Sequence, residues 1–185
     1  KTKMYSNATV QSDGSLTFTG AWNGLFKAGK EAHTDPALIL WDVLTNERYG
    51  FGNHVSESQL DKYSFYNVSV YNNEQIDDGT GTGSKHARFA FNGVISQQTD
   101  AFRLINDVCS SMRCMAYWSA GGISLSQDSP KDSSYLFTLA NVTEPGFSYS
   151  GSGARTRATQ INVSYMDNET QEIDWEEVSD TAMQN

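Results

Sequence analysis

The chain has 185 residues, with 13 basic and 22 acidic side chains and a formal net charge of −9. A chain of this length folds as one domain, or as one domain and a small additional part, and it can bury a sizeable hydrophobic core. The negative charge argues against nucleic acid and anionic membranes as partners. No apolar run approaches the ~20 residues that span a bilayer, and no signal-peptide pattern opens the chain.

The first 30 residues predict a strand or hairpin arm followed by a tryptophan-containing linker. Polar and apolar residues alternate over residues 15–19, directly after the turn residues 13–14. Trp22 and Phe26 then stand between glycines. We expect both aromatic rings to fold back onto the core as a lid. The alternative is that Trp22 is an exposed carbohydrate-binding residue.

The next stretch predicts a short amphipathic helix with a defined beginning and end. Thr34 or Asp35 suits the N-cap, and Pro36 falls at the first helical position, where its missing N–H costs nothing. Apolar side chains recur at roughly helical spacing until Asn46 ends the pattern. The expected inward face consists of Leu38, Trp41, Val43 and Leu44.

A glycine turn and a second helix are expected after the first helix. Gly50 and Gly52 predict a sharp turn, because glycine tolerates the positive backbone angles that bulkier residues resist. A helix over residues 57–71 follows, in which Ser56 and Gln59 have the spacing of a capping box. The polar stretch that comes next predicts an exposed loop over residues 72–84.

The middle of the chain predicts a strand, a helix and a hairpin. Residues 88–95 predict a strand, and Thr99 suits the N-cap of a third helix. The apolar runs 115–119 and 123–127 flank the turn residues 120–122, which is typical of a hairpin. The order gives an α+β fold, in which a small β-α-β-β sheet has helices packed on one face. We expect one core cluster of Leu38, Trp41, Leu44, Phe102, Ile105, Val108, Trp118 and Leu125.

The last part of the chain predicts antiparallel strands of a neighbouring sheet, to which the first 20 residues can contribute. Near-alternating runs occur at 135–138, 146–149 and 160–165, and the last of them pairs with 171–175. The C-terminal residues are expected to fray. The chain is therefore divided here into residues 1–30 (strand or hairpin and linker), 31–130 (α+β domain) and 131–185 (β-rich segment).

Residues that carry metal or catalytic chemistry are scattered along the chain. Asp77 and Asp78 lack the alternating oxygen ligands and closing glutamate of a calcium loop. Cys109 and Cys114 lie where a helix gives way to a strand, and we expect two free thiols, because that geometry carries the side chains apart. No metal-ligand pair includes the histidines, which are His33, His54 and His86. We expect no catalytic, cofactor-binding or metal-binding residues and no enzyme activity.

Two blocks of sequence resemble one known family. The first block is Pro36-Ala37, Leu40-Trp41-Asp42-Val43-Leu44-Thr45 and Arg48-Tyr49-Gly50-Phe51-Gly52. The second is Asp100-Ala101-Phe102, Leu104-Ile105, Cys109-Ser110-Ser111-Met112-Arg113-Cys114-Met115 and Trp118. In this order and at this distance, they resemble the tail tip attachment proteins of long-tailed phages, also called host-specificity or central tail hub proteins. The resemblance covers about residues 17–178.

The resemblance implies a structural role in the virion. It implies a module of a trimeric hub that closes the tail tube, contacts other tail tip proteins and is assembled in the host cytoplasm. Family members are much longer, so the resemblance and the first residue, Lys1, indicate an internal segment, with receptor binding elsewhere. The alternative function is a secreted carbohydrate-binding module, which predicts exposed, coplanar aromatic rings, whereas the hub hypothesis predicts that Trp41 and Trp118 are buried.

Overall fold

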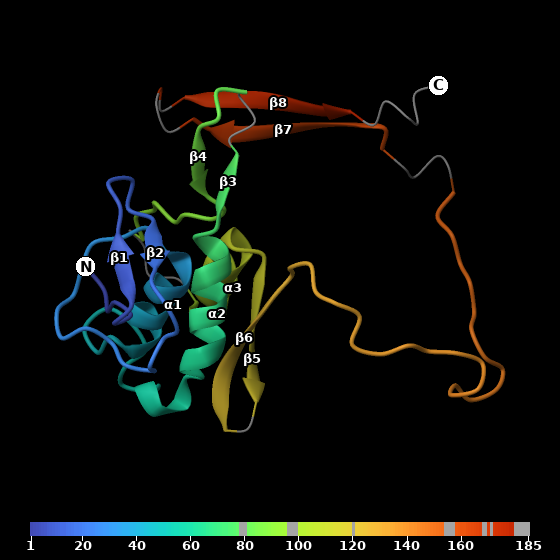
Figure 1. Cartoon of the computed structure of the whole chain (residues 1–185), viewed down its shortest axis with the longest axis horizontal. Helices are drawn as coiled ribbons and strands as arrows, with labels where there is room; N and C mark the ends of the chain where they lie inside the picture. Colours follow the sequence, from blue (N-terminus) through green and yellow to red (C-terminus); the bar gives the residue numbers. More distant parts are fainter. Residues whose placement is uncertain are drawn as a thin grey trace. The chain divides into compact units, whose positions relative to one another are not determined.

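The computed structural model describes residues 1–77, 81–95, 100–119, 121–153, 158–167, 170 and 172–179. The chain divides into two compact units, the first unit over residues 1–131 and the second unit over residues 132–185. The described residues form helices and small antiparallel two-stranded sheets, which confirms the α+β class (Figure 1). The elements are β1 (Ala8–Val10), β2 (Leu16–Phe18), α1 (Pro36–Thr45), η1 (Glu57–Gln59), α2 (Lys62–Asn72), β3 (Gln75–Asp77), β4 (Lys85–Ala87), α3 (Ala101–Ser111), β5 (Cys114–Ser119), β6 (Gly122–Gln127), β7 (Gln160–Met166) and β8 (Ile173–Ser179).

The N-terminal hairpin forms as the sequence predicts. The Asp13 carboxylate accepts hydrogen bonds from the backbone N–H and the hydroxyl of Ser15, at 2.9 and 2.7 Å, and so fixes the turn between β1 and β2. Within the described residues, β1 and β2 pair only with each other, so they do not extend the C-terminal sheet. Trp22 and Phe26 are half-buried and pack against the core, as expected for a lid.

Helix α1 has the predicted ends. Asp35 is the N-cap, and its Oδ2 accepts a hydrogen bond from the Leu38 N–H at 3.1 Å. Pro36 is the first helical residue, and the helix ends at Thr45 with Asn46 as the C-cap. These local signals suffice because each cap is satisfied by residues within one turn.

The glycine turn after α1 has a different cause from the one that we predicted. Among the described residues, the glycines with positive φ do not include Gly50 or Gly52. Both are needed because the backbone approaches closely. A Cβ atom on Gly50 would lie 2.0 Å from the carbonyl oxygen of Val43, and one on Gly52 would lie 2.4 Å from that of Thr45. The prediction of a sharp turn is confirmed, and the prediction of positive backbone angles is wrong.

The second helix is divided into two. The short 3₁₀ helix η1 contains the predicted capping box, and Leu60 is then extended and forms a parallel bridge to Ile123 of β6. Helix α2 begins only after Asp61, whose carboxylate accepts from the N–H groups of Tyr63 and Ser64 at 3.1 and 3.4 Å. The bridge and the new cap together end the first helix early.

The strand expected over residues 88–95 is irregular backbone. Its amides bond singly to separate parts of the chain, since Phe89 N donates to Asn72 O, at the end of α2, at 2.9 Å and Phe91 N donates to Thr34 O, before α1, at 2.8 Å. A short hairpin forms instead, in which β3 lies within the stretch predicted as an exposed loop and β4 follows directly after that stretch. The β5–β6 sheet therefore has two strands among the described residues, with the bridge at Leu60 on the free side of β6.

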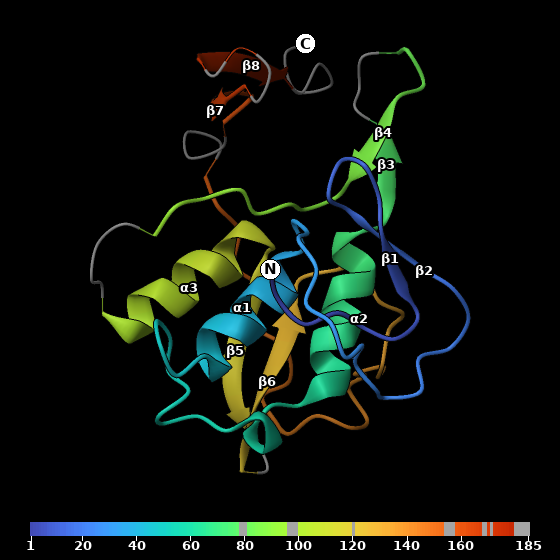
Figure 2. The ribbon, with the colours of Figure 1, turned by 90° about the vertical axis from the view of Figure 1, so that its left-hand side faces the viewer.

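Helix α3 and the β5–β6 hairpin complete the first unit. The N-cap of α3 is Asp100, whereas the predicted cap Thr99 lies outside the described residues. Figure 2 shows α1 between α2 and α3, with the β5–β6 hairpin behind them. Cys109 and Cys114 are both free, as predicted. The predicted reason is wrong, because the helix end and the strand start bring the two thiols together, and they hydrogen-bond to each other.

The core of the first unit consists of two clusters rather than one. Trp41, Leu44, Val108 and Leu125 are buried in the larger cluster, with Ile105 half-buried against it. The smaller cluster contains the remaining buried member of the predicted set, Leu38, with Met4, Tyr5, Ala8 and Leu16.

Phe102 and Trp118 are wrong as core predictions, because 73% and 63% of their surfaces are exposed. Both continue an inward-facing pattern, but Phe102 is in the first turn of α3 and Trp118 is next to the last residue of β5. The buried part of α3 is confined to Val108 and Cys109, near its C-terminal end. The pattern therefore extends beyond the part of each element that neighbours cover.

A buried polar network joins the two clusters around Asp35, whose residue surface is 0% exposed. Its carboxylate accepts from the Ser69 hydroxyl at 2.6 Å and from the Asn73 amide at 3.2 Å, besides the cap bond to α1. Asn73 Oδ1 in turn accepts from the Leu16 N–H at 2.7 Å, and the Tyr5 and Ser69 hydroxyls are 3.0 Å apart. The network therefore connects the N-terminal hairpin to α1 and α2. Burial of the Asp35 carboxylate is tolerated because both of its oxygens accept hydrogen bonds.

The second unit contains one hairpin and a long irregular segment. The strands predicted at 135–138 and 146–149 are absent, since the backbone there forms turns and irregular structure. The predicted pairing of 160–165 with the following run is confirmed by β7–β8, although β8 extends from Ile173 to Ser179. No described residue of this unit is buried. The sequence predicts fraying for Glu176, Glu177 and residues 179–185. This prediction is wrong for Glu176, Glu177 and Ser179, which belong to β8, and the rest of that range lies outside the described residues.

Candidate functional site

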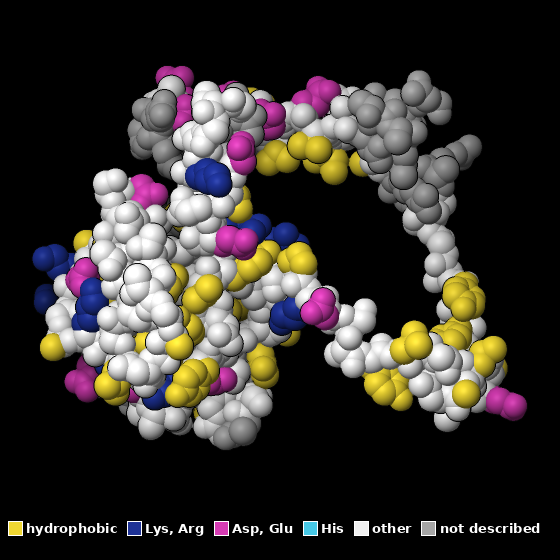
Figure 3. Space-filling view, viewed as in Figure 1, with side chains coloured by type: hydrophobic (Ala, Val, Ile, Leu, Met, Phe, Trp, Pro, Cys, Tyr) yellow, Lys and Arg dark blue, Asp and Glu magenta, His cyan; other side chains and the backbone are white. Residues whose placement is uncertain are grey.

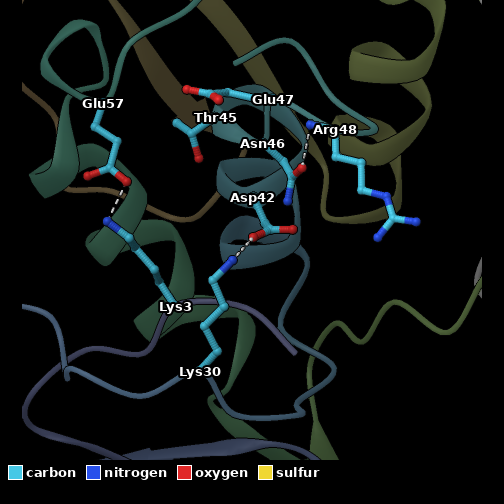
Figure 4. A pocket seen from close by; sticks show the side chains of 8 residues that line it. All are labelled: Lys3, Lys30, Asp42, Thr45, Asn46, Glu47, Arg48 and Glu57. Atoms are coloured by element: carbon cyan, nitrogen blue, oxygen red, sulfur yellow. Dashed lines mark hydrogen bonds and ion pairs between the residues drawn. The ribbon is translucent and has the colours of Figure 1, made fainter. Parts of the chain in front are cut away.

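A charged pocket lies beside the C-terminal end of α1 (Figure 4). It has a volume of about 330 Å³ and is contributed by the N-terminal segment, the last turns of α1, the loop after α1 and η1. Its lining residues are Lys3, Lys30, Asp42, Thr45, Asn46, Glu47, Arg48 and Glu57.

Asp42 is the buried acid of this pocket, with 7% of its surface exposed. Lys30 Nζ lies 3.1 Å from its Oδ1, and the Tyr49 hydroxyl donates a hydrogen bond to its Oδ2. The hydrogen bond to Asp42, followed by burial, raises the pKa of Tyr49 to about 12. Tyr49 therefore remains a protonated donor at neutral pH, and it does not serve as a general base.

The loop after α1 is held by hydrogen bonds that its own backbone N–H groups donate. Asn46 Oδ1 accepts from the N–H groups of Arg48 and Tyr49, at 2.9 and 3.4 Å. Gly50 N donates to Asn46 O, and Phe51 N donates to Val43 O. The exposed side chain of Arg48 is consequently presented on a fixed support rather than on a flexible loop.

The charges of the pocket are balanced and mostly paired. Lys3 forms an ion pair with Glu57, and Lys30 forms one with Asp42. Within the described ranges, no group of three His, Cys, Asp or Glu side chains is arranged to hold a metal ion.

We predicted no site residues from the sequence. The histidines and acidic residues that we considered as candidates are dispersed in the structure. His33 is half-buried, and burial lowers its pKa, whereas His54 and His86 are exposed. Glu176 and Glu177 are neighbours on β8, so they project to opposite faces of the hairpin. Of the acid pair in the polar loop, the second residue, Asp78, lies outside the described residues.

Sequence reasoning missed the pocket itself. The only local signal was the spacing of Asp42 and Tyr49, seven residues apart in the first block. Lys30 precedes its partner by 12 residues, and the Lys3–Glu57 pair joins residues that are 54 apart. Contacts at these separations depend on the folded chain and leave no periodic pattern.

Comparisons with known proteins give the chain a family. No family model matches it. It is 36% identical over 168 residues to the tip attachment protein J of Escherichia phage SECphi27, an alignment that covers 90% of this chain and 14% of that protein. The chain belongs to the tip attachment protein J family. It is also 27% identical over 150 residues to the tip attachment protein J of Escherichia phage SECphi4, covering 80% of this chain and 13% of that protein.

These relationships confirm the resemblance seen in the sequence. The chain spans about one seventh of the length of the curated relatives that it matches. The first block of the resemblance supplies the end of α1 and three of the residues that line the charged pocket, which are Asp42, Thr45 and Arg48. In the part of the chain that the structure describes, no helix is long and apolar enough to cross a membrane.

Proposed function

We propose that the chain is a non-catalytic structural module of a phage tail tip protein. In this proposal it contributes to a trimeric hub in the virion, contacts other tail proteins and is assembled in the cytoplasm of the host. The observation that carries the proposal is the similarity to tip attachment protein J over 90% of the chain. The paired charges of the pocket support a framework role, because they leave no activated nucleophile or acid–base pair.

The pocket at the end of α1 is the surface that we assign to hub contacts. Its loop presents Arg48 beside Glu47, and both side chains are exposed. A loop backbone that is already held by hydrogen bonds loses little conformational entropy on binding, which favours assembly.

The alternative, a secreted carbohydrate-binding module, is not favoured. Trp22 stacks on Tyr66 with ring centroids 4.8 Å apart, and Trp41 is buried. The two exposed tryptophans, Trp118 and Trp175, belong to different units. Each unit thus offers one exposed tryptophan rather than the row of coplanar rings expected of such a module.

Light scattering at ~0.15 M salt, where charges more than ~8 Å apart are largely screened, tests the trimer. The 185-residue chain is expected to be monomeric or weakly associated at micromolar concentration, since obligate rings need large apolar interfaces. A longer chain that includes the neighbouring hub regions is expected to be a trimer. A monomeric longer chain would contradict the proposal. A tight trimer of the short chain would show that the contacts within these 185 residues are sufficient for the trimer, contrary to the expectation that neighbouring hub regions are needed.

A charge reversal tests the pocket. Arg48→Glu in the longer chain is expected to lower the trimer fraction at a given concentration. Lys131→Glu is the matched control, because it makes the same charge change at an exposed residue at the boundary of the first unit. Equal trimer fractions for the two variants would remove the pocket from the interface while leaving the trimer itself intact.

A further inference from the structure

The β7–β8 hairpin is a regular sheet that has no core of its own. β7 and β8 pair from Gln160 opposite Ser179 to Met166 opposite Ile173. Yet all the described side chains of both strands are exposed. A two-stranded hairpin is at best marginally stable in water without further strands or a helix on one face. Its apolar side chains therefore need a cover that the described residues of the second unit do not supply.

One face of the hairpin carries four exposed apolar side chains, Ile161, Val163, Tyr165 and Val178, whereas the exposed Ile173 and Trp175 lie on the other face. Side chains that are paired across an antiparallel ladder share a face, which places Ile161 beside Val178, Val163 beside Glu176, and Tyr165 beside Asp174. The exposed fractions of the four apolar side chains are between 45% and 61%. Figure 3 shows a row of hydrophobic side chains along this hairpin, with acidic side chains beside it.

The same region is acidic without any compensating base. Residues 160–185 contain no Lys, Arg or His. Their acidic residues are Asp167, Glu169, Glu172, Asp174, Glu176, Glu177 and Asp180. These seven residues account for most of the formal net charge of −9. On the apolar face itself, Asp174 and other nearby acids raise the pKa of Tyr165, which indicates a negative potential there.

These observations restrict what can cover the face. A second copy of the hairpin would bring like charges together, and like charges facing each other across an interface suppress association. Anionic lipid and nucleic acid are disfavoured for the same reason. A complementary surface is apolar at its centre and rimmed by Lys and Arg. About six sevenths of the length of the curated relatives lies outside the region matched by this chain.

We propose that the face of the β7–β8 hairpin that carries Ile161, Val163, Tyr165 and Val178 docks on another segment of the same tail tip protein, one that is apolar at its centre and rimmed by Lys and Arg. This inference rests on the proposed function only in that the chain is a module of a longer protein. The acidic side chains of this face, Asp174 and Glu176, then pair with basic side chains of the partner segment. The four apolar side chains are buried in the same contact.

Site-specific photocrosslinking in the full-length protein tests the docking. Benzoylphenylalanine replaces Val163, and in a second protein it replaces Ser164, the next residue, which shares the opposite face with Trp175. After irradiation, mass spectrometry identifies the crosslinked peptide. The Val163 probe is expected to capture a peptide of the same protein outside these 185 residues, with more Lys and Arg than Asp and Glu. The Ser164 probe is expected to capture it at least tenfold less.

Several outcomes would overturn the inference. These are capture of β7–β8 from another copy, of a different tail protein or of a net acidic peptide, equal capture by both probes, and no capture by Val163. Each of them is compatible with a trimeric hub, so this test fails or succeeds separately from the light-scattering test. The intrinsic fluorescence of Trp175 in each protein shows whether the hairpin has kept its fold.

A pair of charge reversals isolates the electrostatic part. Glu176→Lys changes the docking face, and Glu177→Lys makes the same change one residue away on the opposite face. The yield of the Val163 crosslink is expected to fall about tenfold for Glu176→Lys, because a like charge replaces a complementary one at the contact. For Glu177→Lys the yield is expected to change less than about twofold, since Glu177 lies on the face that points away from the docked surface. Equal losses in the two variants would contradict a basic rim on the docking face.

Discussion

The two units of this chain contrast in how they use apolar residues. Among the described residues, every buried hydrophobic side chain lies in the first unit. The second unit has large hydrophobic side chains too, yet none of those described is buried, and all except the half-buried Val142 are exposed. The first unit has helices that cover a small sheet, whereas the described part of the second has a single hairpin and irregular chain. Apolar content alone therefore does not give a core, because a second layer must cover the first.

The contrast extends to polar groups. In the first unit the buried Asp35 carboxylate is bonded by residues from two helices, and Asn73 carries the network on to β2. In the second unit, the Tyr165 hydroxyl donates to Asp174 across the exposed hairpin, at 3.4 Å. A solvent-exposed hydrogen bond competes with water and contributes little to stability, whereas the loss of a buried hydrogen bond lowers stability more. Three comparisons of substitutions and one pH dependence test this difference and the contacts behind it.

The largest effect is expected for tryptophan truncation. Trp41→Ala should lower the free energy of unfolding by about 3–5 kcal/mol, because it removes a buried ring and leaves a cavity. Trp175→Ala, in the second unit, should change it by less than about 0.5 kcal/mol, because the ring is exposed. Urea unfolding of both variants measures the difference. A loss below about 1 kcal/mol for Trp41→Ala would undo the assignment of the core.

The next effect concerns helix caps in two environments. Asp35→Ala should cost about 3 kcal/mol, since the N–H of Leu38 and the polar groups of Ser69 and Asn73 lose a buried acceptor. Asp100→Ala removes the exposed N-cap of α3 and should cost about 1 kcal/mol. Equal losses in urea unfolding would show that the Asp35 network adds nothing beyond a cap.

A third comparison uses glycine. Gly50→Ala should destabilise by about 1–3 kcal/mol, because the added methyl group overlaps the carbonyl oxygen of Val43. Gly151→Ala should lie within about 0.5 kcal/mol of the parent chain, because nothing lies within 4 Å of the added atom. Thermal unfolding of the two variants provides the measurement. If Gly50→Ala were as stable as the parent chain, the loop after α1 would have to shift readily to accommodate the added methyl group.

The smallest effect is a change in pH dependence. The pKa of Tyr49 is raised to about 12 from an ordinary value of 10. The protonated form is therefore favoured in the folded chain, and the resulting stability is present below pH 10 and is lost as the pH rises towards 12. Tyr49→Phe should reduce the loss of stability between pH 10 and 12. It should also remove one late component from the ultraviolet titration of the nine tyrosines. An unchanged late component would contradict the Asp42–Tyr49 contact.

Sequence reasoning succeeded where structure is determined by neighbouring residues. Asp35, Pro36 and Asn46 define α1 within a few positions, and the predicted bounds are those observed. The turn between β1 and β2 is likewise set by Asp13 and Ser15. These signals are complete in the local sequence, so the fold beyond them does not change the outcome.

Sequence reasoning failed where contacts between residues far apart in the chain determine the structure. The bridge from Leu60 to Ile123 divides the second helix, and single hydrogen bonds at Phe89 and Phe91 replace a strand. The charged pocket depends on Lys3 and Lys30, which no local pattern connects to α1. Phe102 and Trp118 fit an inward-facing pattern, but periodicity does not tell how far neighbouring elements extend.

The Asp35 network has a consequence for cooperativity. Asn73 bonds the backbone of Leu16 and Ser69 bonds Tyr5, and both Asn73 and Ser69 also donate to the Asp35 carboxylate that caps α1. Opening the N-terminal hairpin therefore breaks contacts to the residues that satisfy this carboxylate. The hairpin consequently cannot open locally at a low free-energy cost, and its amide hydrogens exchange with solvent only when the helices also open. The first 30 residues, which the sequence presents as an appendage, therefore unfold together with the helices rather than before them.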